Sequence, residues 1–524
     1  MKRMNPLLWP AAFTGAALLL FCVAAGPALA QGPSATPIGS RLELFEDNTL
    51  VESMTGVTLQ LHRPTPAETA ITFDAPWEGN NNGFVTVFKD GDLYRMYYRS
   101  VPGNTDVTGK DWECLVSYAE SRDGIRFVKP NLGLVEFGGN KNNNIISRSN
   151  SKWSIDPKVG RTGKESWIDS IEVNFTPFLD SNPSAPSTER YKATGGIGRG
   201  LFTFVSPDGI NWKQKGSRPV MTQQSRPIAL LRDQLFESHN SVFWDTVQEQ
   251  YVAYVRDSIA APDTGELTRG IRRSVSKDFV EWSIPELLDY GSSPTTQLYT
   301  VAVTPYFRAP HIYFAFPMRY LDHRERYINA RFKVPKEYAA FRGTGLTDAV
   351  FMSSRDGMLW PRRFLEAFVR PGADMYNWTD RSNAVALGLV PTGPDEMSVY
   401  IAQHYRLPSN HVRRGVLRLD GIVSVNASYR GGEVVTTPVI FTGRTLVVNY
   451  ATSAAGGLRV ELQDVNGKPI RGFALKDAVE QYGDSVRQTI SWDANPHLKR
   501  LAGTPVRIRF VMKDADLYSY QFQD

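Results

Sequence analysis

The fold is decided by a short stretch that recurs along the chain, SRDGIRF at residues 121–127, SPDGINW at 206–212 and SRDGMLW at 354–360. A degenerate copy, SKDFVEW at 276–282, lacks the glycine. In the shared pattern, the aspartate can hydrogen-bond the backbone beyond it, the glycine supplies positive φ, and the aromatic residue packs the returning strand. The pattern therefore predicts a tight turn between the outer two strands of a four-stranded unit.

Groups of short strands precede these turns and repeat along the chain. Before the first turn they are FVTVF at 84–88, LYRMYY at 93–98 and CLVSYA at 114–119, and helical periodicity is scarce throughout. Counting the groups gives five units, at about residues 83–127, 170–212, 239–282, 298–360 and 382–425. Repeated units of this kind predict an all-β chain with a five-bladed β-propeller.

From residue 426 onward the strands no longer follow the repeat. About 100 residues of short strands separated by turn residues are typical of a β-sandwich. In LRVEL at 458–462, apolar residues alternate with Arg459 and Glu461, as one packed and one solvated face require. We predict a signal peptide at 1–30, the propeller at 31–425 and the sandwich at 426–524.

The N-terminus is typical of an exported protein. Lys2 and Arg3 precede an apolar stretch at 7–26, and Ala28 and Ala30 are the small residues of a cleavage site. We expect cleavage near Ala30 and a secreted or periplasmic protein, with a retained anchor helix as the alternative. No later stretch resembles a membrane span. The mature chain then contains a single cysteine and forms no internal disulfide.

The composition and motifs of the chain argue against several classes of ligand. With 59 Lys and Arg against 54 Asp and Glu, the charge is close to balanced, which argues against a nucleic-acid partner. The seven histidines are scattered and no H-E-x-x-H motif is present, so no metal site is predicted. The Asp and Asn content would suit a structural Ca²⁺ in the channel, although the sequence does not require one. Gly-rich nucleotide-binding loops are absent, and we expect no cofactor.

Several motifs together resemble the five-bladed β-propeller glycosidases, the family 43 and family 32 group that holds arabinanases, β-xylosidases, invertases and levanases. They are PWEG at 76–79, NSVFWD at 240–245 and the repeated turns, and DADLYSY at 514–520 looks like the closing strand of an invertase-like sandwich. The invertase signature W-x-N-D-P-N-G and an E-C acid motif are absent. The resemblance implies a carbohydrate substrate.

The candidate site residues lie just before the inner strand of each unit, because those positions converge on the mouth of a propeller channel. The candidates for catalysis are Glu78, Asp169 and Glu237, and those for substrate binding are Trp77, Asn82, Trp167, His239, Tyr299, Trp378, Asp380 and Arg381.

Glycoside hydrolysis needs two carboxyl groups, one protonated and one ionised. The resemblance implies that Glu78 is the nucleophile or base, Glu237 the acid and Asp169 the stabiliser. The family usually has Asp in the first role, so Glu78 is a departure, and Glu172 could replace Asp169.

Each candidate also has a structural interpretation. Glu78 could cap a turn, and Asp169 could be a solvated loop acid. His239 could be a satisfied structural histidine. Asp380 and Arg381 could form an ion pair, or Arg381 could lower the pKa of a neighbour and hold a substrate oxygen. The tryptophans could stack on a sugar ring or fill the core.

The sequence thus favours a secreted glycoside hydrolase acting on an oligo- or polysaccharide. This hypothesis requires Glu78 and Glu237 to face one pocket, about 5 to 10 Å apart. The alternatives are a non-catalytic carbohydrate-binding propeller and a polysaccharide lyase. A lyase would use Tyr299 or His239 as base and Arg381 to neutralise a uronate. The sequence leaves the oligomeric state open.

Overall fold

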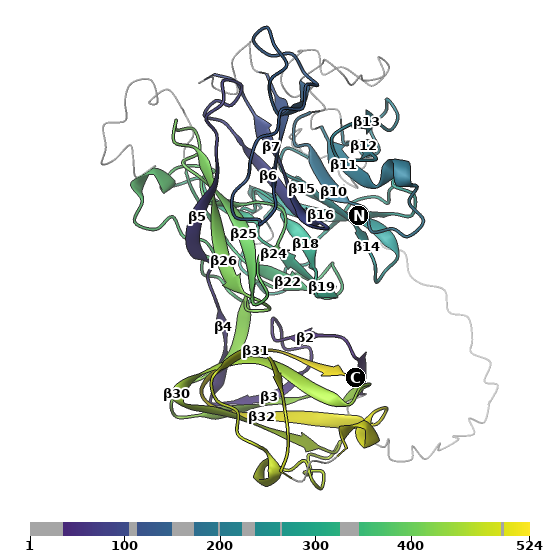
Figure 1. Cartoon of the computed structure of the whole chain (residues 1–524), viewed down its shortest axis with the longest axis vertical. Coiled ribbons are helices and arrows are strands. Elements are labelled where there is room, and N and C mark those ends of the chain that lie inside the picture. Colours follow the sequence, from purple (N-terminus) through teal and green to yellow (C-terminus); the bar gives the residue numbers. More distant parts are fainter. Residues whose placement is uncertain are drawn as a thin grey trace, which may run out of the picture.

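The computed structural model describes residues 35–103, 113–148, 172–196, 200–222, 236–261, 265–324, 345–493 and 497–524. The chain forms two lobes joined by a narrow waist (Figure 1). The upper lobe contains six small sheets, which make up five units, and the lower lobe contains one ten-stranded sheet. Regular structure in these ranges is strand, apart from short 3-10 turns at Ser187–Glu189, Met375–Asn377, Leu475–Asp477 and Leu498–Leu501. The prediction of an all-β chain is confirmed.

The first three sheets of the upper lobe are four-stranded meanders with the strands in sequence order. The first holds β6 (Gly83–Asp90), β7 (Leu93–Ser100), β8 (Leu115–Ser121) and β9 (Ile145–Arg148). The second holds β10 (Thr176–Leu179), β11 (Tyr191–Gly195), β12 (Phe202–Ser206) and β13 (Lys213–Gln214). The third holds β14 (Ser241–Asp245), β15 (Gln250–Ala260), β16 (Leu267–Ser276) and β17 (Glu286–Leu287).

The fourth and fifth units depart from this plan. In the fourth, β18 (Val303–Tyr306), β19 (Ala309–Ala315) and β22 (Met352–Ser354) form one sheet, and β20 (Met318–Leu321) pairs with β21 (Leu346–Ala349). The fifth holds β23 (Ala384–Val385), β24 (Val390–Pro391), β25 (Glu396–Gln403), β26 (His411–Arg418) and β5 (Thr65–Thr72). Its outer strand β5 thus comes from the N-terminal end of the chain.

The five units close into a ring through their inner strands. Strand β10 contacts both β6 and β14, β14 contacts β18, and β21 contacts β23. The ring closes where β24 and β25 contact β6, and Val87 N–H donates to the Leu387 carbonyl across this junction. The upper lobe is therefore a propeller.

The repeated turns hold neighbouring units together. In the first turn, Gly124 N–H donates to Ser121 Oγ, and the Asp123 carboxylate accepts from two backbone N–H groups beyond it. Tyr400 of the fifth unit donates to the Gly124 carbonyl. Equivalent bonds between neighbouring units run from Tyr97 to the Gly209 carbonyl and from Tyr254 to the Gly357 carbonyl, each 2.9 Å. The turns therefore serve as latches between units as well as hairpins.

The lower lobe is built on two long strands, β30 (Thr445–Gln463) and β32 (Pro505–Gln523), which pair with each other. The pairing has a register break between Thr452 and Gly457. Phe510 and Tyr520 are ten positions apart on β32, a span of about 33 Å if straight, yet their ring centroids are 5.8 Å apart. The sheet therefore folds over its own core, as a β-sandwich does.

The remaining strands of the lower lobe come from both ends of the chain. The N-terminal ones are β1 (Thr36–Gly39), β2 (Glu43–Leu44), β3 (Val51–Thr55) and β4 (Val57–Leu61). The C-terminal ones are β27 (Val423–Ala427), β28 (Gly432–Thr436), β29 (Val439–Phe441) and β31 (Asp484–Thr489). In the pairing, β1 joins β29, β2 joins β32, β3 joins β28 and β4 joins β27.

These pairings change the expected domain boundaries. Residues 36–61, which we expected in the propeller, belong to the sandwich, and so does β27, whose first residues we expected to end the fifth unit. The physical reason is that alternation reveals a half-buried strand but does not identify its partner. The predicted signal peptide lies outside the described residues.

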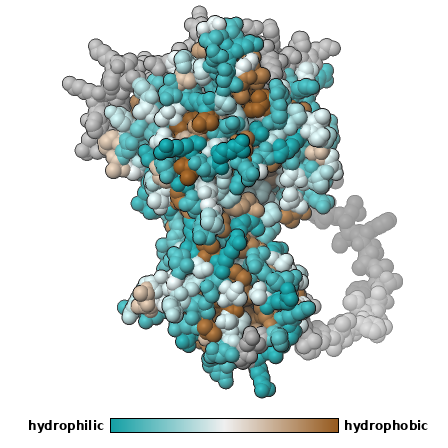
Figure 2. Space-filling model, in the orientation of Figure 1, coloured by the Kyte–Doolittle hydropathy of each residue, from teal (hydrophilic) through white to brown (hydrophobic). Residues whose placement is uncertain are grey.

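Buried side chains also join the two lobes. One apolar cluster combines Leu42 and Leu44 of the N-terminal segment with Phe316 and Phe351 of the fourth unit. Arg355 of the third repeated turn forms ion pairs with Glu43 and Asp47, and its Nη2 lies 2.9 Å from Glu46 Oε1. Hydrophobic residues on the visible outer face are scattered among mainly hydrophilic ones (Figure 2). The sandwich therefore packs against the propeller through both a core and charged contacts.

Candidate functional site

A pocket lies where the inner strands of several units begin. Its lining comes from four of the five units: Gly83, Phe84, Val85, His239, Tyr299, Thr300, Met318, Arg381, Ala384, Val385, Ala386, Ala402 and Tyr405. The enclosed space is about 30 Å³, room for roughly one or two water molecules. A sugar ring bound here would lie over this opening rather than inside it. The pocket contains three predicted residues, His239, Tyr299 and Arg381.

His239 is held as a neutral imidazole. Burial, followed by the charge of Arg99, lowers its pKa to about 3. Its Nε2 lies 2.9 Å from the Thr86 hydroxyl, and its ring lies 5.8 Å from that of Phe84. At neutral pH this side chain can therefore donate one hydrogen bond and accept another, but it carries no charge.

Tyr299 is surrounded by guanidinium groups. Arg256 and Arg269 each place the guanidinium carbon 5.2 Å from the centre of the Tyr299 ring. The guanidinium carbon of Arg381 lies 5.7 Å from the same ring. Burial, and then the neighbouring Arg256, lowers the pKa of Arg269. Cations on an aromatic face are stabilised by its quadrupole, which offsets part of their mutual repulsion.

Tyr405 is also surrounded by arginine side chains. Burial raises the pKa of its phenol, but Arg99, Arg381 and Arg406 outweigh that effect, so the net pKa is lowered. Arg99 Nη2 donates to the Tyr405 hydroxyl at 3.1 Å and to Asn81 Oδ1 at the same distance. The Tyr405 hydroxyl itself donates to Asn81 Oδ1. A phenol held this way is suited to accept or release a proton.

Two carboxylates accompany these arginines. Asp380 is buried, and its Oδ2 lies 3.4 Å from Arg381 Nε and 3.5 Å from an Arg406 nitrogen. Glu237 is more open, with 32% of its side chain exposed, and it accepts from Arg256 at 3.0 Å. Neither acid is among the residues that line the pocket, but the arginines they contact, Arg256 and Arg381, both border the Tyr299 ring.

Backbone strain gathers at the same end of the ring. Positive φ occurs at Phe84 (49°), Ala302 (46°), Arg381 (61°), Asn383 (67°) and Arg406 (68°), none of which is glycine. Non-glycine residues adopt this region only when the surrounding structure enforces it, and such residues cluster at functional sites. The strain supports the assignment of this end as the functional one.

Glu78 is placed away from the pocket lining. Its Oε1 accepts from the Tyr98 hydroxyl at 2.5 Å, and its Oε2 accepts from Lys129 at 2.6 Å and from the Ala75 N–H at 2.9 Å. The carboxylate is fully buried. Both oxygens therefore hold the loop that leads into β6.

Two neighbours of Glu78 also fix this loop. Trp77 donates from its indole to Asn144 Oδ1, and its ring lies 6.2 Å from that of Phe137. Asn82 is buried and donates to the Gly79 carbonyl. Neither residue is among those that line the pocket.

The other predicted residues fall elsewhere. Trp378 lines a separate cavity of about 530 Å³, together with Arg319 of the fourth unit and Arg370. Glu172 is buried and accepts from Ser147 at 3.2 Å. Trp167 and Asp169 lie outside the described residues.

Sequence reasoning missed Arg99, Arg256, Arg269, Tyr405 and Arg406, because they lie on or after second and third strands rather than before first strands. One signal was available. Arg99 and Arg256 each lie two residues beyond a latch tyrosine, Tyr97 or Tyr254, in the second strand of their units. A period of two puts each pair on one face of its strand.

Metal-binding clusters and membrane spans are both missing from the described ranges. These ranges contain no group of three or more His, Cys, Asp or Glu residues arranged to hold a metal ion. They also contain no helix that is long and apolar enough to span a bilayer.

No protein family and no curated protein matched the sequence. Solved structures with a similar fold include BT0996 in a complex with RGII, at 13% identity and a TM-score of 0.43, covering 69% of this protein and 93% of that one. Another is a glycoside hydrolase, at 13% identity and a TM-score of 0.43, covering 68% and 92%. A fructofuranosidase from Schwanniomyces occidentalis has 10% identity and a TM-score of 0.39, covering 86% and 96%. With TM-scores this low, we draw neither substrate nor mechanism from them.

Proposed function

We propose that this protein is a glycoside hydrolase that cleaves an oligo- or polysaccharide at the pocket on the propeller axis. The observation that carries the proposal is the convergence of two carboxylates, Glu237 and Asp380, on the arginines that border Tyr299. Aromatic rings of Phe84, Tyr299 and Tyr405 line the same opening and offer faces for a sugar ring.

The two acids would divide the roles that hydrolysis requires. Glu237 is partly exposed, so it can exchange its proton with water between turnovers, and we assign it as the general acid. Asp380 is buried beside two guanidinium groups, and we assign it as the nucleophile or the base. Glu237 would give its proton to the leaving oxygen while Asp380 attacks the anomeric carbon or deprotonates the attacking water.

Glu78 takes a positioning role in this proposal. Its carboxylate already accepts three hydrogen bonds, so an attack on a sugar would first require those bonds to break. We propose that it fixes residues 79–82, a loop whose Asn81 receives hydrogen bonds from Arg99 and Tyr405. This replaces the catalytic role that we expected for Glu78 from the sequence.

The test is a hydrolysis screen on defined glycans with the wild-type chain and three matched variants. We expect Glu237→Gln and Asp380→Asn each to lower kcat by about 10²–10⁴-fold, with each variant still unfolding cooperatively. Glu78→Gln should keep wild-type kcat per folded molecule while unfolding at a lower temperature. Loss of kcat in Glu78→Gln alone would return the catalytic role to Glu78 and contradict the present assignment.

A polysaccharide lyase is the second candidate, and the lowered pKa of Tyr405 favours it. Tyr405 as phenolate would take the proton from the carbon next to a uronate carboxylate, and an arginine would neutralise that carboxylate. The carbon–oxygen bond to the leaving sugar would break, a carbon–carbon double bond would form, and the proton would pass to the leaving oxygen. Ultraviolet absorbance of the unsaturated product separates the two: a lyase generates it, and a hydrolase does not.

A further inference from the structure

Positive charge exceeds negative charge around the two tyrosines of the pocket. Five guanidinium groups border them, those of Arg99, Arg256, Arg269, Arg381 and Arg406. The carboxylates in ion-pair contact with this group in the described ranges are Glu237 and Asp380. Among the described residues, these guanidinium groups therefore outnumber the carboxylates in ion-pair contact with them.

Two of the arginines, Arg99 and Arg269, form hydrogen bonds only to neutral partners in the described ranges. Arg99 donates to Asn81 and Tyr405, which are neutral partners. Arg269 donates to the Gln297 side-chain oxygen, also a neutral partner. Within the part of the chain that the structure describes, neither guanidinium has a carboxylate within ion-pair distance, and the Nε of each is buried without a hydrogen-bond acceptor. A buried N–H donor without an acceptor costs folding free energy, because it has lost its hydrogen bonds to water.

These two arginines, which have no ion-pair partner among the described residues, border different aromatic residues of the pocket lining. Arg99 places its guanidinium carbon 4.5 Å from the centre of the Phe84 ring, and Phe84 lines the pocket. Arg269 lies between Tyr299 and Tyr320, at 5.2 Å and 4.8 Å from the ring centres. Aromatic faces near planar guanidinium groups form a surface on which a sugar can stack while an anionic substituent receives paired N–H donors.

From these contacts we infer that the pocket recognises an acidic sugar, one carrying a carboxylate or a sulfate group, with Arg99 and Arg269 as anion-binding residues. The inference rests on the proposed carbohydrate-active function and names the class of its substrate. Carboxylate and sulfate each offer a guanidinium a pair of anionic acceptor oxygens, so the structure assigns their shared chemistry.

The test compares sugars that differ only in the substituent at one position, which is charged in some and neutral in others. Oligosaccharides in the galacto, gluco and manno series are each prepared with a 6-carboxylate, a 6-sulfate, a 6-methyl ester and a 6-hydroxyl group, and binding is measured calorimetrically at low salt. We expect at least one acidic member to bind the wild-type chain ten-fold or more tightly than its neutral counterparts. Comparing the affinities of the 6-carboxylate and 6-sulfate sugars shows which of the two anionic groups the pocket binds.

Three variants locate the effect. Arg99→Gln and Arg269→Gln should each reduce acidic-sugar affinity about ten-fold and leave neutral-sugar affinity within two-fold. Arg122→Gln removes the same charge from an exposed turn position and should change neither affinity. Thermal unfolding of each variant confirms that it is folded.

Equal affinity for acidic and neutral members, or no binding of any acidic member, would overturn the inference. Cleavage of neutral glycans alone would overturn it and leave the proposed hydrolase standing. Acidic-sugar binding without any bond cleavage would sustain the inference and defeat the proposed enzyme.

Discussion

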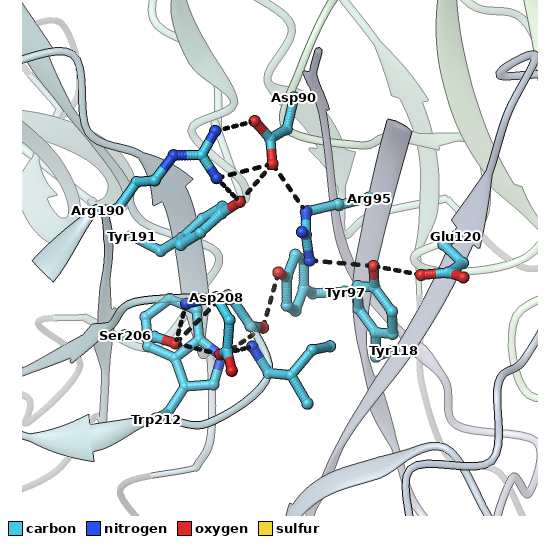
Figure 3. A network of polar contacts seen from close by, with 12 residues as sticks. Asp90, Arg95, Tyr97, Tyr118, Glu120, Arg190, Tyr191, Ser206, Asp208 and Trp212 are labelled. Carbon is cyan, nitrogen blue, oxygen red and sulfur yellow. Dashed lines mark hydrogen bonds and ion pairs between the residues drawn. The ribbon is translucent and has the colours of Figure 1, made fainter. Parts of the chain in front are cut away.

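Strand β7 carries two arginine–tyrosine clusters, four residues apart, that differ in how their charge is compensated. At its outer end, Arg95 donates to Asp90, and the same carboxylate accepts from Arg190 and Tyr191 (Figure 3). At its inner end, Arg99 contacts Asn81 and Tyr405 and has no carboxylate among the described residues within ion-pair distance. We call these the Asp90 cluster and the Tyr405 cluster.

Under the proposed function, this difference separates a structural network from a binding one. In the Asp90 cluster, burial raises the pKa of the carboxyl group, but hydrogen bonds from Arg190 and Tyr191 outweigh it, so the net pKa is lowered. All the contacts that Figure 3 marks join groups of the chain itself. In the Tyr405 cluster, Arg99 Nε has no acceptor among the described residues, and a ligand of the proposed site would supply one.

The largest expected effect comes from comparing Arg95→Gln with Arg99→Gln. Removing Arg95 leaves the Asp90 carboxylate with one cation fewer, and we expect the free energy of unfolding to fall by about 2–3 kcal/mol. Removing Arg99 eliminates a poorly compensated charge, and we expect a change of about 0.5 kcal/mol or less. Urea unfolding of both variants measures this. Equal destabilisation would show that the two clusters are both structural.

A third cluster, at the junction of the lobes, places Arg355 against three acidic side chains, those of Glu43, Glu46 and Asp47. Burial raises the pKa of Glu46 to about 8, while contacts with His311, Arg355 and Arg41 outweigh burial and lower the pKa of Glu43 to about 2. The folded state thus keeps a proton on Glu46 that the unfolded state releases above its ordinary pKa of 4.5.

The sign of the resulting pH dependence follows from proton binding. Since the folded chain binds more protons between about pH 4.5 and pH 8, the Glu46 contribution to stability falls as pH rises through this window. Glu46→Gln should remove that loss and raise the free energy of unfolding at pH 8 by about 1–2 kcal/mol, with little change at pH 4.5. A variant that is less stable than wild type at pH 8 would contradict the assignment of a protonated Glu46.

How far the sequence predicts this molecule depends on which contacts are local. The repeated turns were recognisable because the hydrogen bonds of Ser121, Asp123 and Gly124 all lie within seven consecutive residues. The pairing of β5 with β26 was not, because Ile71 and Val412 are separated by most of the chain and alternation carries no information on the partner.

The site shows the same limit. Residues that precede inner strands could be expected at the pocket, and three of them, His239, Tyr299 and Arg381, line it. Arg99 and Tyr405 reach the site from second strands or beyond them, and their grouping depends on how neighbouring units pack. The Glu78 carboxylate accepts hydrogen bonds from Lys129 and Tyr98, and no spacing rule in the sequence indicated these partners.

The latch tyrosines give a smaller and more uniform effect. Tyr400→Phe removes the bond that joins the fifth unit to the Gly124 carbonyl, and Tyr97→Phe and Tyr254→Phe remove its equivalents. Each should lower the free energy of unfolding by about 1 kcal/mol, the usual net value of a hydrogen bond. Tyr482, which is 74% exposed, supplies a control substitution to Phe with no expected effect. Unchanged stability in all three variants would rule out a structural role for the latches.

The smallest effect is the titration of Tyr405 itself, one of 22 tyrosines. Its phenol faces Arg99, Arg381 and Arg406, which lower its pKa, and Asp380, which raises it. Tyr405 should therefore ionise at a lower pH than an ordinary tyrosine, and its stabilising contribution should be lost as pH falls through that lowered pKa. Ultraviolet absorbance of phenolate should show one early step that Tyr405→Phe removes and Tyr482→Phe keeps. Because salt screens the three cations, adding it should move that step to higher pH. A step that is insensitive to salt, or that survives in Tyr405→Phe, would show that the inner cluster is as internally compensated as the Asp90 cluster.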